Sequence, residues 1–328
     1  MKAFGFLAGV IALTFGSLTG VNALASTVSN YPNHAIRAVV PFPAGGINDL
    51  VARMVFEKLA KTLDGKIIID NRPGAGGMIG SKLAVDSAPD GYTVLLGAAS
   101  SMVVAPNMYS DATYHPKKDL IPIGGIGSVA SVMCVPASSP FKTLGDLVAA
   151  AKARPDALNF GSAGIGTSHH MQTALLELRT GIHMTHVPYK GGAPAMTDLI
   201  GGQIQLLLEP LPTAVPHIKS GAVRALGVTT KERSPLLPDV PTFMQAGIKD
   251  YEASTWFGAF VPVGTPPPIV KKLSDALIKT LDDPALKTLL QARGIEPMPM
   301  NHQTFAKFVS SENDTWKRVI EQGHLQVR

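Results

Sequence analysis

The chain has 328 residues, a length typical of about two domains. Apolar residues make up 45% of it and charged residues only 16%, so it can bury a sizeable core, which excludes a disordered chain. Its single cysteine, Cys134, excludes an internal disulfide and a thiolate metal cage. The net charge of +5 includes no basic run longer than a pair, so we expect no nucleic-acid binding.

Residues 1–25 have the pattern of a secretory signal peptide. Lys2 precedes an apolar run over residues 3–15, and small residues follow as far as Ala23-Leu24-Ala25, which matches an A-x-A cleavage site. A membrane anchor is the alternative, because residues 3–25 carry no charge and almost reach a spanning length. The Gly/Ser/Thr content and the cleavage motif favour cleavage after Ala25 and export as a soluble protein.

Short β-rich runs alternate with segments of helical period along the mature chain. The expected strands are residues 36–42, 66–70, 93–98, 131–136, 158–161, 184–189, 204–208, 223–229 and 256–263. The expected helices are residues 49–63, 143–153, 168–180, 193–200 and 266–281. Continuously apolar runs such as Ile67-Ile68-Ile69 indicate strands buried on both faces. The alternation predicts an α/β architecture with mainly parallel sheets, in which ligands bind at the carboxyl ends of the strands.

Two of the expected strand-to-helix loops resemble each other. The first reads Pro41-Phe42-Pro43-Ala44-Gly45-Gly46, and the second reads Pro188-Tyr189-Lys190-Gly191-Gly192-Ala193. Glycines let backbone N–H groups approach a ligand, and the helix that follows adds the positive end of its dipole. The pattern therefore indicates an anion site in each half of the chain. Two ordinary turns are the alternative, because turns also use Gly and Pro.

Other motifs give weaker support for a site. Gly74, Gly76 and Gly80 approximate a dinucleotide fingerprint, but they do not follow their strand directly, so a turn into a helix is the better interpretation. His169-His170 and the later histidines have no carboxylate at ligand spacing, which argues against a metal site. A nucleophile elbow would need glycine where Phe160 stands. We therefore expect no cofactor, no metal and no catalytic set.

Several spaced motifs together resemble those of one family. The motifs are residues 40–46 with Asp49, 70–77, 89–93, 186–191, 224–229, 238–242 and 263–266. In this order, over residues 31–294, they resemble the extracytoplasmic solute receptors of tripartite tricarboxylate transporters, the Bug family. The resemblance implies a periplasmic binding protein of the type II kind, with two α/β lobes, two hinge crossings and a ligand cleft between the lobes. It also implies a small carboxylate ligand, no enzymatic activity and transient contact with membrane transporter subunits, and we expect a monomer.

The resemblance assigns ligand binding to the two glycine-rich loops and to residues 161–167. The expected ligand-binding residues are Phe42, Ala44, Gly45, Gly46, Asp49, Ser100, Ser162, Gly164, Thr167, Ser168, His169, Tyr189, Lys190, Gly191, Glu209 and Trp256. Asp49 is better interpreted as a cap or first-turn acid of its helix than as a ligand contact. Glu209 stands where many relatives carry Asp, so the longer acid is expected to protrude further into the cleft. Trp256 is expected either to wall the cleft or to fill the core where a strand crosses between the lobes.

The lobe boundaries follow from the need to place the two loops opposite each other. Residues 26–125 and 229–328 are expected to form a discontinuous lobe 1, and residues 126–228 are expected to form lobe 2. Two other functions compete with the receptor, namely a secreted hydrolase and a sensor that signals to a membrane protein. For the hydrolase, Ser168 and His169 are the local nucleophile–base candidate, but neighbouring side chains on a helix point about 100° apart.

Overall fold

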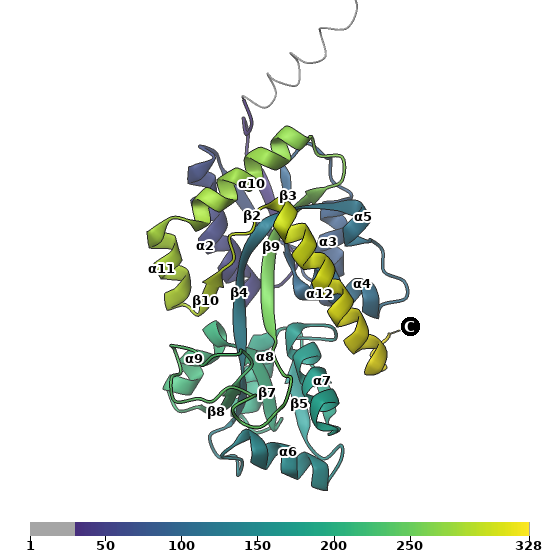
Figure 1. The fold of residues 1–328 in the computed structure, drawn as a ribbon, viewed down its shortest axis with the longest axis vertical. Coiled ribbons are helices and arrows are strands. Elements are labelled where there is room, and N and C mark those ends of the chain that lie inside the picture. The colour runs from purple at the N-terminus through teal and green to yellow at the C-terminus, as the bar shows by residue number, and fades with distance from the viewer. Residues whose placement is uncertain (1–29, 328) are drawn as a thin grey trace, which may run out of the picture.

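The computed structural model describes residues 30–327, so the expected signal peptide lies outside the described residues. The described chain forms two α/β lobes that share one mixed sheet (Figure 1). In spatial order its strands are β2 (Ile67–Asn71), β1 (Ile36–Val40), β3 (Thr93–Ala98), β9 (Ser254–Pro262), β4 (Leu120–Pro136), β7 (Leu206–Pro210), β5 (Asn159–Ser162) and β6 (Thr185–Pro188), while β10 (Ile295–Pro297) and β8 (Val223–Val228) pair with β4. No helix within residues 30–327 is both long and apolar enough to cross a bilayer.

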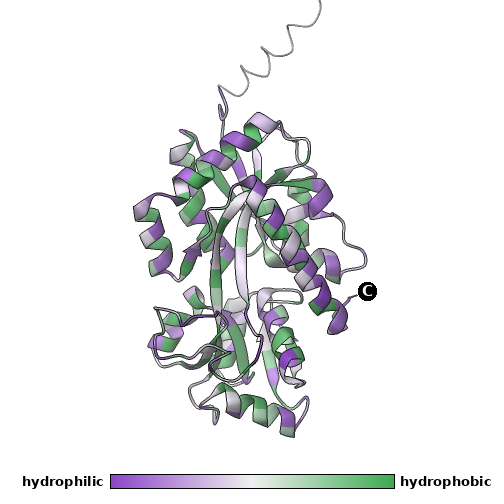
Figure 2. Ribbon diagram, viewed as in Figure 1, coloured by the Kyte–Doolittle hydropathy of each residue, from purple (hydrophilic) through white to green (hydrophobic). Residues whose placement is uncertain are grey.

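Helices cover both faces of the sheet in each lobe. Those of lobe 1 are α2 (Ile47–Thr62), α3 (Met78–Val85), α4 (Ala105–Met108), α5 (Pro116–Asp119), α10 (Pro267–Leu281), α11 (Pro284–Ala292) and α12 (His302–Gln322), with the short turns η1 (Ala75–Gly77) and η2 (Ser100–Val104). Those of lobe 2 are α6 (Leu144–Ala153), α7 (Ser168–Thr180), α8 (Gly192–Ile200) and α9 (Leu211–Lys219). Figure 2 shows polar residues mainly on these helices and apolar residues mainly on the strands between them.

The strand period decides which core each side chain enters. On β3, Leu95 packs with α12, whereas Val94 and Leu96 pack with α2, α10 and α11 on the opposite face. On β4, Val132 packs with α8 and α9, whereas Met133 packs with α6 and α7. Each lobe is therefore a sheet between two helical layers, and strand-to-helix loops from both lobes meet where the lobes face each other.

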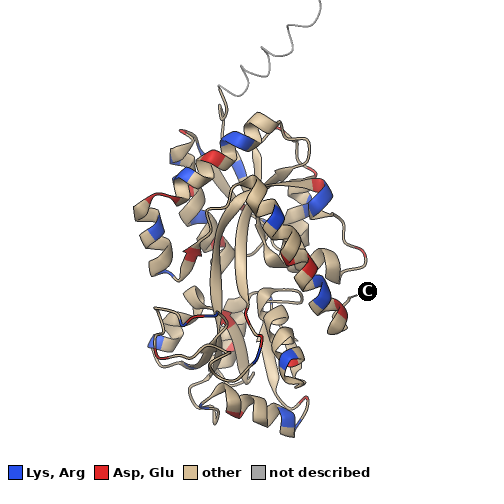
Figure 3. Ribbon diagram, viewed as in Figure 1, with Lys and Arg blue, Asp and Glu red and all other residues tan. Residues whose placement is uncertain are grey.

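Two antiparallel strands, β4 and β9, connect the lobes. β4 pairs with β9 as far as Ala130, and from Ser131 it pairs with β7 and β8 of lobe 2. The first half of β4 was not predicted as a strand, because Gly124, Gly125 and Gly127 interrupt its apolar pattern. A Cβ at Gly124 would lie 2.7 Å from the carbonyl oxygen of Met300, so the missing side chains make room for neighbouring backbone. Neither connecting strand carries Lys, Arg, Asp or Glu (Figure 3).

The second crossing between the lobes lies later in the chain than expected. Residues 229–253 stay on lobe 2, where the Phe243 N–H donates to the Val228 carbonyl at 2.9 Å and the Ala253 N–H donates to the Thr229 carbonyl at 3.0 Å. The chain returns to lobe 1 only at β9, so the expected boundary at residue 229 is corrected to residue 253. The segment is irregular and is held by backbone hydrogen bonds, which leave no periodic signal in the sequence.

Close packing of β9 against α12 gives a first test of this fold. A Cβ at Gly258 of β9 would overlap the ring of Phe305 of α12 and would lie 3.0 Å from the Gly124 carbonyl oxygen. We expect Gly258→Ala to lower the free energy of unfolding by about 1–3 kcal/mol, the usual cost of overpacking a core. Gly145→Ala is the control, because Gly145 lies in the first turn of α6 with only the Thr143 hydroxyl nearby, at 3.6 Å. Chemical unfolding should show the control equal to or more stable than the wild type, and a neutral Gly258→Ala would contradict this packing.

Candidate functional site

The two glycine-rich loops face each other across a cavity between the lobes. The cavity has a volume of about 520 Å³ and is lined by residues 42–48 from lobe 1 and by residues 190–194, with Thr167, His169 and Glu209, from lobe 2. A second cavity of about 610 Å³ shares Phe42 and Lys190 with the first and continues between residues 73–77 and residues 163–165. Together the two cavities form the cleft between the lobes.

Four helices begin at the first cavity without a side-chain cap, and α2, α7 and α8 are the three whose N-cap residue carries an N–H. The N-cap residues are Gly46 for α2, Thr167 for α7 and Gly191 for α8. At none of these positions does a side-chain atom accept a hydrogen bond from a backbone N–H of the helix. The Thr167 hydroxyl instead donates to the carbonyl of Gly164 at 2.7 Å. Because the first N–H groups of a helix have no acceptor within it, these three starts present free donors and positive dipole ends to one space.

Helices that begin away from this cavity are capped differently. Thr143 and Asp146 form a capping box on α6, Asp283 caps α11 and Asn301 caps α12. Helix α10 begins with two prolines, which carry no N–H. Among the described helices of eight or more residues, the uncapped starts other than that of α10 therefore lie at the cleft, where a bound anion can satisfy them.

Asp49 belongs to the first turn of α2 and is turned away from the cavity. Its Oδ2 atom accepts hydrogen bonds from the Gly45 N–H and from Arg53 Nε, both at 2.9 Å. Burial acts to raise the pKa of Asp49, but hydrogen bonds from Arg53 and Gly45 outweigh it and hold the pKa below its usual value. The N–H of Gly45, expected as a ligand donor, is thus used within the loop. The donors left for a ligand are those of Gly46 and the first turn of α2.

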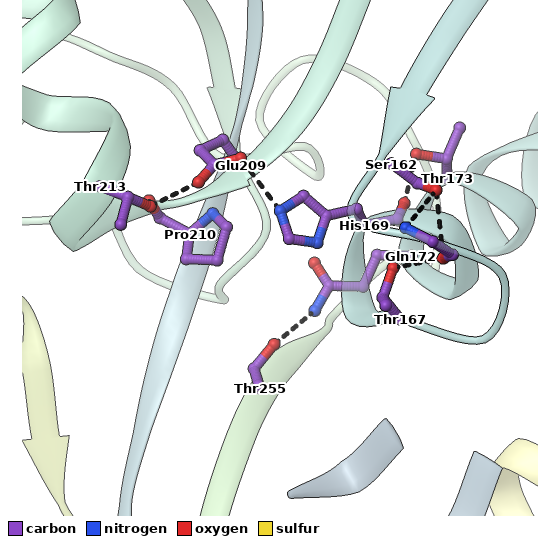
Figure 4. Close-up of polar contacts among 10 residues, drawn as sticks. Ser162, Thr167, His169, Gln172, Thr173, Glu209, Pro210, Thr213 and Thr255 are labelled. Atoms are coloured by element: carbon purple, nitrogen blue, oxygen red, sulfur yellow. Dashed lines mark hydrogen bonds and ion pairs between the residues drawn. The ribbon is translucent and has the colours of Figure 1, made fainter. Parts of the chain in front are cut away.

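Glu209 and His169 form a buried pair in the wall of the cavity (Figure 4). His169 Nε2 lies 3.0 Å from Glu209 Oε2, and the Thr213 hydroxyl donates to Glu209 Oε1 at 2.5 Å. The Glu209 side chain is only 4% exposed. Both carboxylate oxygens therefore already accept a hydrogen bond, and the acid is folded against its own lobe instead of extending freely into the cleft.

Two stacked histidines support the loop formed by residues 161–167. The rings of His170 and His186 lie 4.1 Å apart and nearly parallel. His170 Nδ1 accepts the Gly166 N–H at 3.2 Å, and His186 Nε2 lies 2.6 Å from the Ser162 hydroxyl. Burial lowers the pKa of His170 to about 3 and that of His186 to about 4, so both rings stay neutral. Ser162 next to His186 has the composition of a nucleophile–base pair, but Ser162 is fully buried beneath the loop.

Most of the expected ligand-binding residues line the cleft. Phe42, Ala44, Gly45, Gly46, Thr167, His169, Lys190, Gly191 and Glu209 line the first cavity, and Gly164 and Tyr189 line the second. Tyr189 is fixed by a 2.7 Å hydrogen bond from its hydroxyl to Asp198. Asp49, Ser100, Ser162, Ser168 and Trp256 line neither cavity.

Trp256 takes the second of the two places expected for it, the core. Its indole Nε1 donates to Glu312 of α12 at 2.9 Å, and its ring packs edge-on against Phe305 and Phe308. It therefore fills the core behind β9 and does not wall the cleft. Ser100 is buried at the start of η2, and Ser168 is the first residue of α7, and neither residue lines the two cavities.

Helix α9 supplies a fourth strand-to-helix junction, which the sequence did not predict. Further lining residues of the first cavity are Ile47, Asn48, Met196, Pro210, Pro212, Thr213, Pro216 and His217. Pro212 and Pro216 lie inside α9, and prolines argue against a helix when only the sequence is read. The sequence offered one signal for this junction, which is that Glu209 and Pro210 directly follow the continuously apolar run at the start of β7. Among the described residues, no three His, Cys, Asp or Glu side chains are grouped to hold a metal ion.

The neutral histidine stack predicts a specific pH dependence of stability. The unfolded chain takes up protons on these histidines below about pH 6.5, whereas folded His170 does so only near pH 3. The free energy of unfolding therefore falls as the pH drops through this window. Replacement of His170 by Asn keeps an acceptor for Gly166 but removes this titration.

We compare the free energy of unfolding of His170→Asn with that of the wild type. When the pH is lowered from about 7.5 to about 5, we expect this difference to shift by about 2 kcal/mol in favour of the variant. Urea unfolding at both pH values measures this. Burial raises the pKa of Glu177 to about 7, which gives the opposite slope, but Glu177 is present in both proteins and cancels in the comparison. Parallel pH profiles would show that His170 titrates normally and that the stack is not neutral.

Comparison with known proteins agrees with this arrangement. The model of the tripartite tricarboxylate transporter family receptor matches residues 51–325. Protein BugT of Bordetella pertussis (strain Tohama I) is 33% identical over 315 residues, which cover 96% of this chain and 95% of that protein.

Solved structures with bound carboxylates have the same fold. Rpa4515 of R. palustris with adipate has a TM-score of 0.86 and 32% identity, covering 90% of this chain and 98% of that one. MatC (Rpa3494) from Rhodopseudomonas palustris with bound malate has a TM-score of 0.82 and 32% identity, covering 88% of this chain and 100% of that one. These likenesses confirm the expected two-lobed α/β fold. The chain belongs to the receptor family of the tripartite tricarboxylate transporters, the Bug family, as its motifs predicted.

Proposed function

We propose that the protein is a periplasmic receptor that captures a small carboxylate between its lobes and delivers it to the membrane subunits of a tripartite tricarboxylate-type transporter. The observation that carries this proposal is the convergence of three uncapped helix starts, from both lobes, on one cavity. The carboxylates bound by the R. palustris relatives add support from proteins of similar sequence and fold.

A carboxylate suits these donors chemically. Each of its oxygens accepts more than one hydrogen bond, and bonds from N–H groups to a charged acceptor are stronger than neutral ones. Lys190 is the permanent cation among the described residues that line the first cavity, and it is exposed. Backbone donors, rather than a bidentate arginine, therefore hold the anion in this proposal.

The receptor acts by closure of its lobes. A ligand that contacts α2 of lobe 1 and α8 of lobe 2 is bound more tightly by the closed form than by the open form, so it shifts the population towards closure. The strands β4 and β9 are the connections about which the lobes turn. Binding without turnover is sufficient for this role, and the buried Ser162–His186 pair offers a ligand no accessible nucleophile.

Export and assembly complete the proposal. The signal-peptide pattern of residues 1–25 and the solute-binding relatives support a periplasmic location for the mature chain. A monomer is sufficient, since both halves of the cleft come from one chain.

Substitution at Gly46 tests the anion site. Gly46 has φ −84° and ψ 176°, which other residues adopt, and a Cβ there would contact only the Pro43 carbonyl oxygen, at 3.6 Å. Gly46→Val should therefore fold and still block access to the α2 donors. We expect its carboxylate affinity, measured by calorimetry, to fall by about tenfold or more, because one charge-assisted hydrogen bond is worth about 1.5–3 kcal/mol.

Gly145→Val is the matched control, because it adds the same side chain to the first turn of α6, outside the cleft. It should bind as the wild type does. A Gly46→Val protein that melts normally and binds with unchanged affinity would show that the anion site lies elsewhere. Failure of the wild type to bind any mono-, di- or tricarboxylate would refute the receptor function itself.

Closure gives a second measurement on the wild type. Small-angle scattering should show a smaller radius of gyration after addition of a carboxylate shown by calorimetry to bind. An unchanged radius, with an open form verified before addition, would contradict the hinge mechanism.

A further inference from the structure

The lobe 2 wall of the first cavity contains an apolar patch beside its donors. Pro194, Met196, Pro210, Pro212 and Pro216 form this patch. Pro194 is the third residue of α8 and Pro212 is the second residue of α9, so each helix lacks one N–H in its first turn. Each of these starts therefore has one donor fewer than a start without proline.

The same wall already contains a negative charge. Glu209 is the one carboxylate among the described residues that line this cavity, and it directly precedes Pro210 at the start of α9. A Cβ at Gly192 would lie 3.1 Å and 3.2 Å from the two Glu209 carboxylate oxygens. The carboxylate therefore lies beside the first residue of α8, next to the place where a ligand would meet that helix start.

The neighbouring histidine does not neutralise this acid. His169 Nδ1 is buried and has no hydrogen-bond partner among the described residues. A proton on Nδ1 in addition to the one on Nε2 would bury a charged donor without an acceptor, which is costly. The geometry therefore suits a neutral His169 that donates from Nε2 to an ionised Glu209.

We infer that the cavity selects a small carboxylate with one charged end and an apolar body, and that Glu209 excludes a second carboxylate. This inference rests on the proposed function. The single carboxylate takes the donors of the open helix starts, and the body lies against the prolines and Met196. A second carboxylate would lose its hydration next to Glu209 and the prolines, so the free energy of its desolvation would not be recovered.

A series of ligands that differ in one end group tests the inference on the wild type. Hexanoate, adipate and 6-aminohexanoate share a six-carbon chain and end in methyl, carboxylate and ammonium. We expect calorimetry to show hexanoate binding at least about tenfold more tightly than adipate, because the second carboxylate would meet Glu209. Tighter binding of adipate would overturn the inference and leave the receptor function standing. Tighter binding of 6-aminohexanoate would also overturn it, because Glu209 would then be a cation site.

Glu209→Gln tests the residue itself. Glutamine keeps the shape and an acceptor for His169, and its amide can donate to Thr213 in place of accepting. We expect adipate affinity to rise by about tenfold, with hexanoate affinity changed by less than about threefold. An unchanged ratio of hexanoate to adipate affinity would overturn the role of Glu209.

Glu177→Gln is the control for loss of a half-buried acid from the same lobe. Glu177 lies on α7, as His169 does, and accepts the Met184 N–H at 2.7 Å, but it lines neither cavity. Its hexanoate-to-adipate ratio should equal that of the wild type. If Glu209→Gln does not fold, the ligand series on the wild type still decides the selectivity.

Discussion

The site depends on one electrostatic constraint, the unpaired N–H groups at the start of a helix. Each such start needs an acceptor, and a protein usually supplies it from its own side chains. Here α6, α11 and α12 are satisfied in that way, whereas α2, α7 and α8 are left open where the lobes meet. The fold thus brings three open starts together, and in the proposed function an anion accepts hydrogen bonds from both lobes.

Open donors are useful to a ligand only if the loops that carry them are held in place. Asp49 holds the first loop through the Gly45 N–H, and the stacked His170 holds the 161–167 loop through the Gly166 N–H. Both supports lie on the helix that follows the loop, so each helix fixes the backbone that leads into it. The neutral imidazole of His170 and the Arg53-paired carboxylate of Asp49 each bind their loop from its own helix. The side of each loop that faces the cavity therefore stays free for the ligand.

Local signals in the sequence predicted most of the fold and the front of the site. Residues 93–98 and 168–180 were placed correctly as strand and helix, since apolar period and helix starts are local properties. The first half of β4 and helix α9 were missed, because glycines and prolines needed there for close packing or for the cavity wall look like breaks. Glu209 was identified as a site residue, but its contacts were not. His169 lies far from it in the sequence, and Thr213 lies in helix α9, which was missed.

The proposed closure of the lobes would order few long side chains at the edge of the cleft. A Cβ on Gly166 of lobe 2 would lie 3.3 Å from Met108 Sδ of lobe 1, and one on Gly76 of lobe 1 would lie 3.4 Å from the Ile165 carbonyl oxygen of lobe 2. At these two places the lobes meet with glycine backbone on one side, so fewer long side chains must be ordered when they approach. More of the free energy of ligand binding then remains as affinity, which lets a few backbone hydrogen bonds suffice to hold a small ligand.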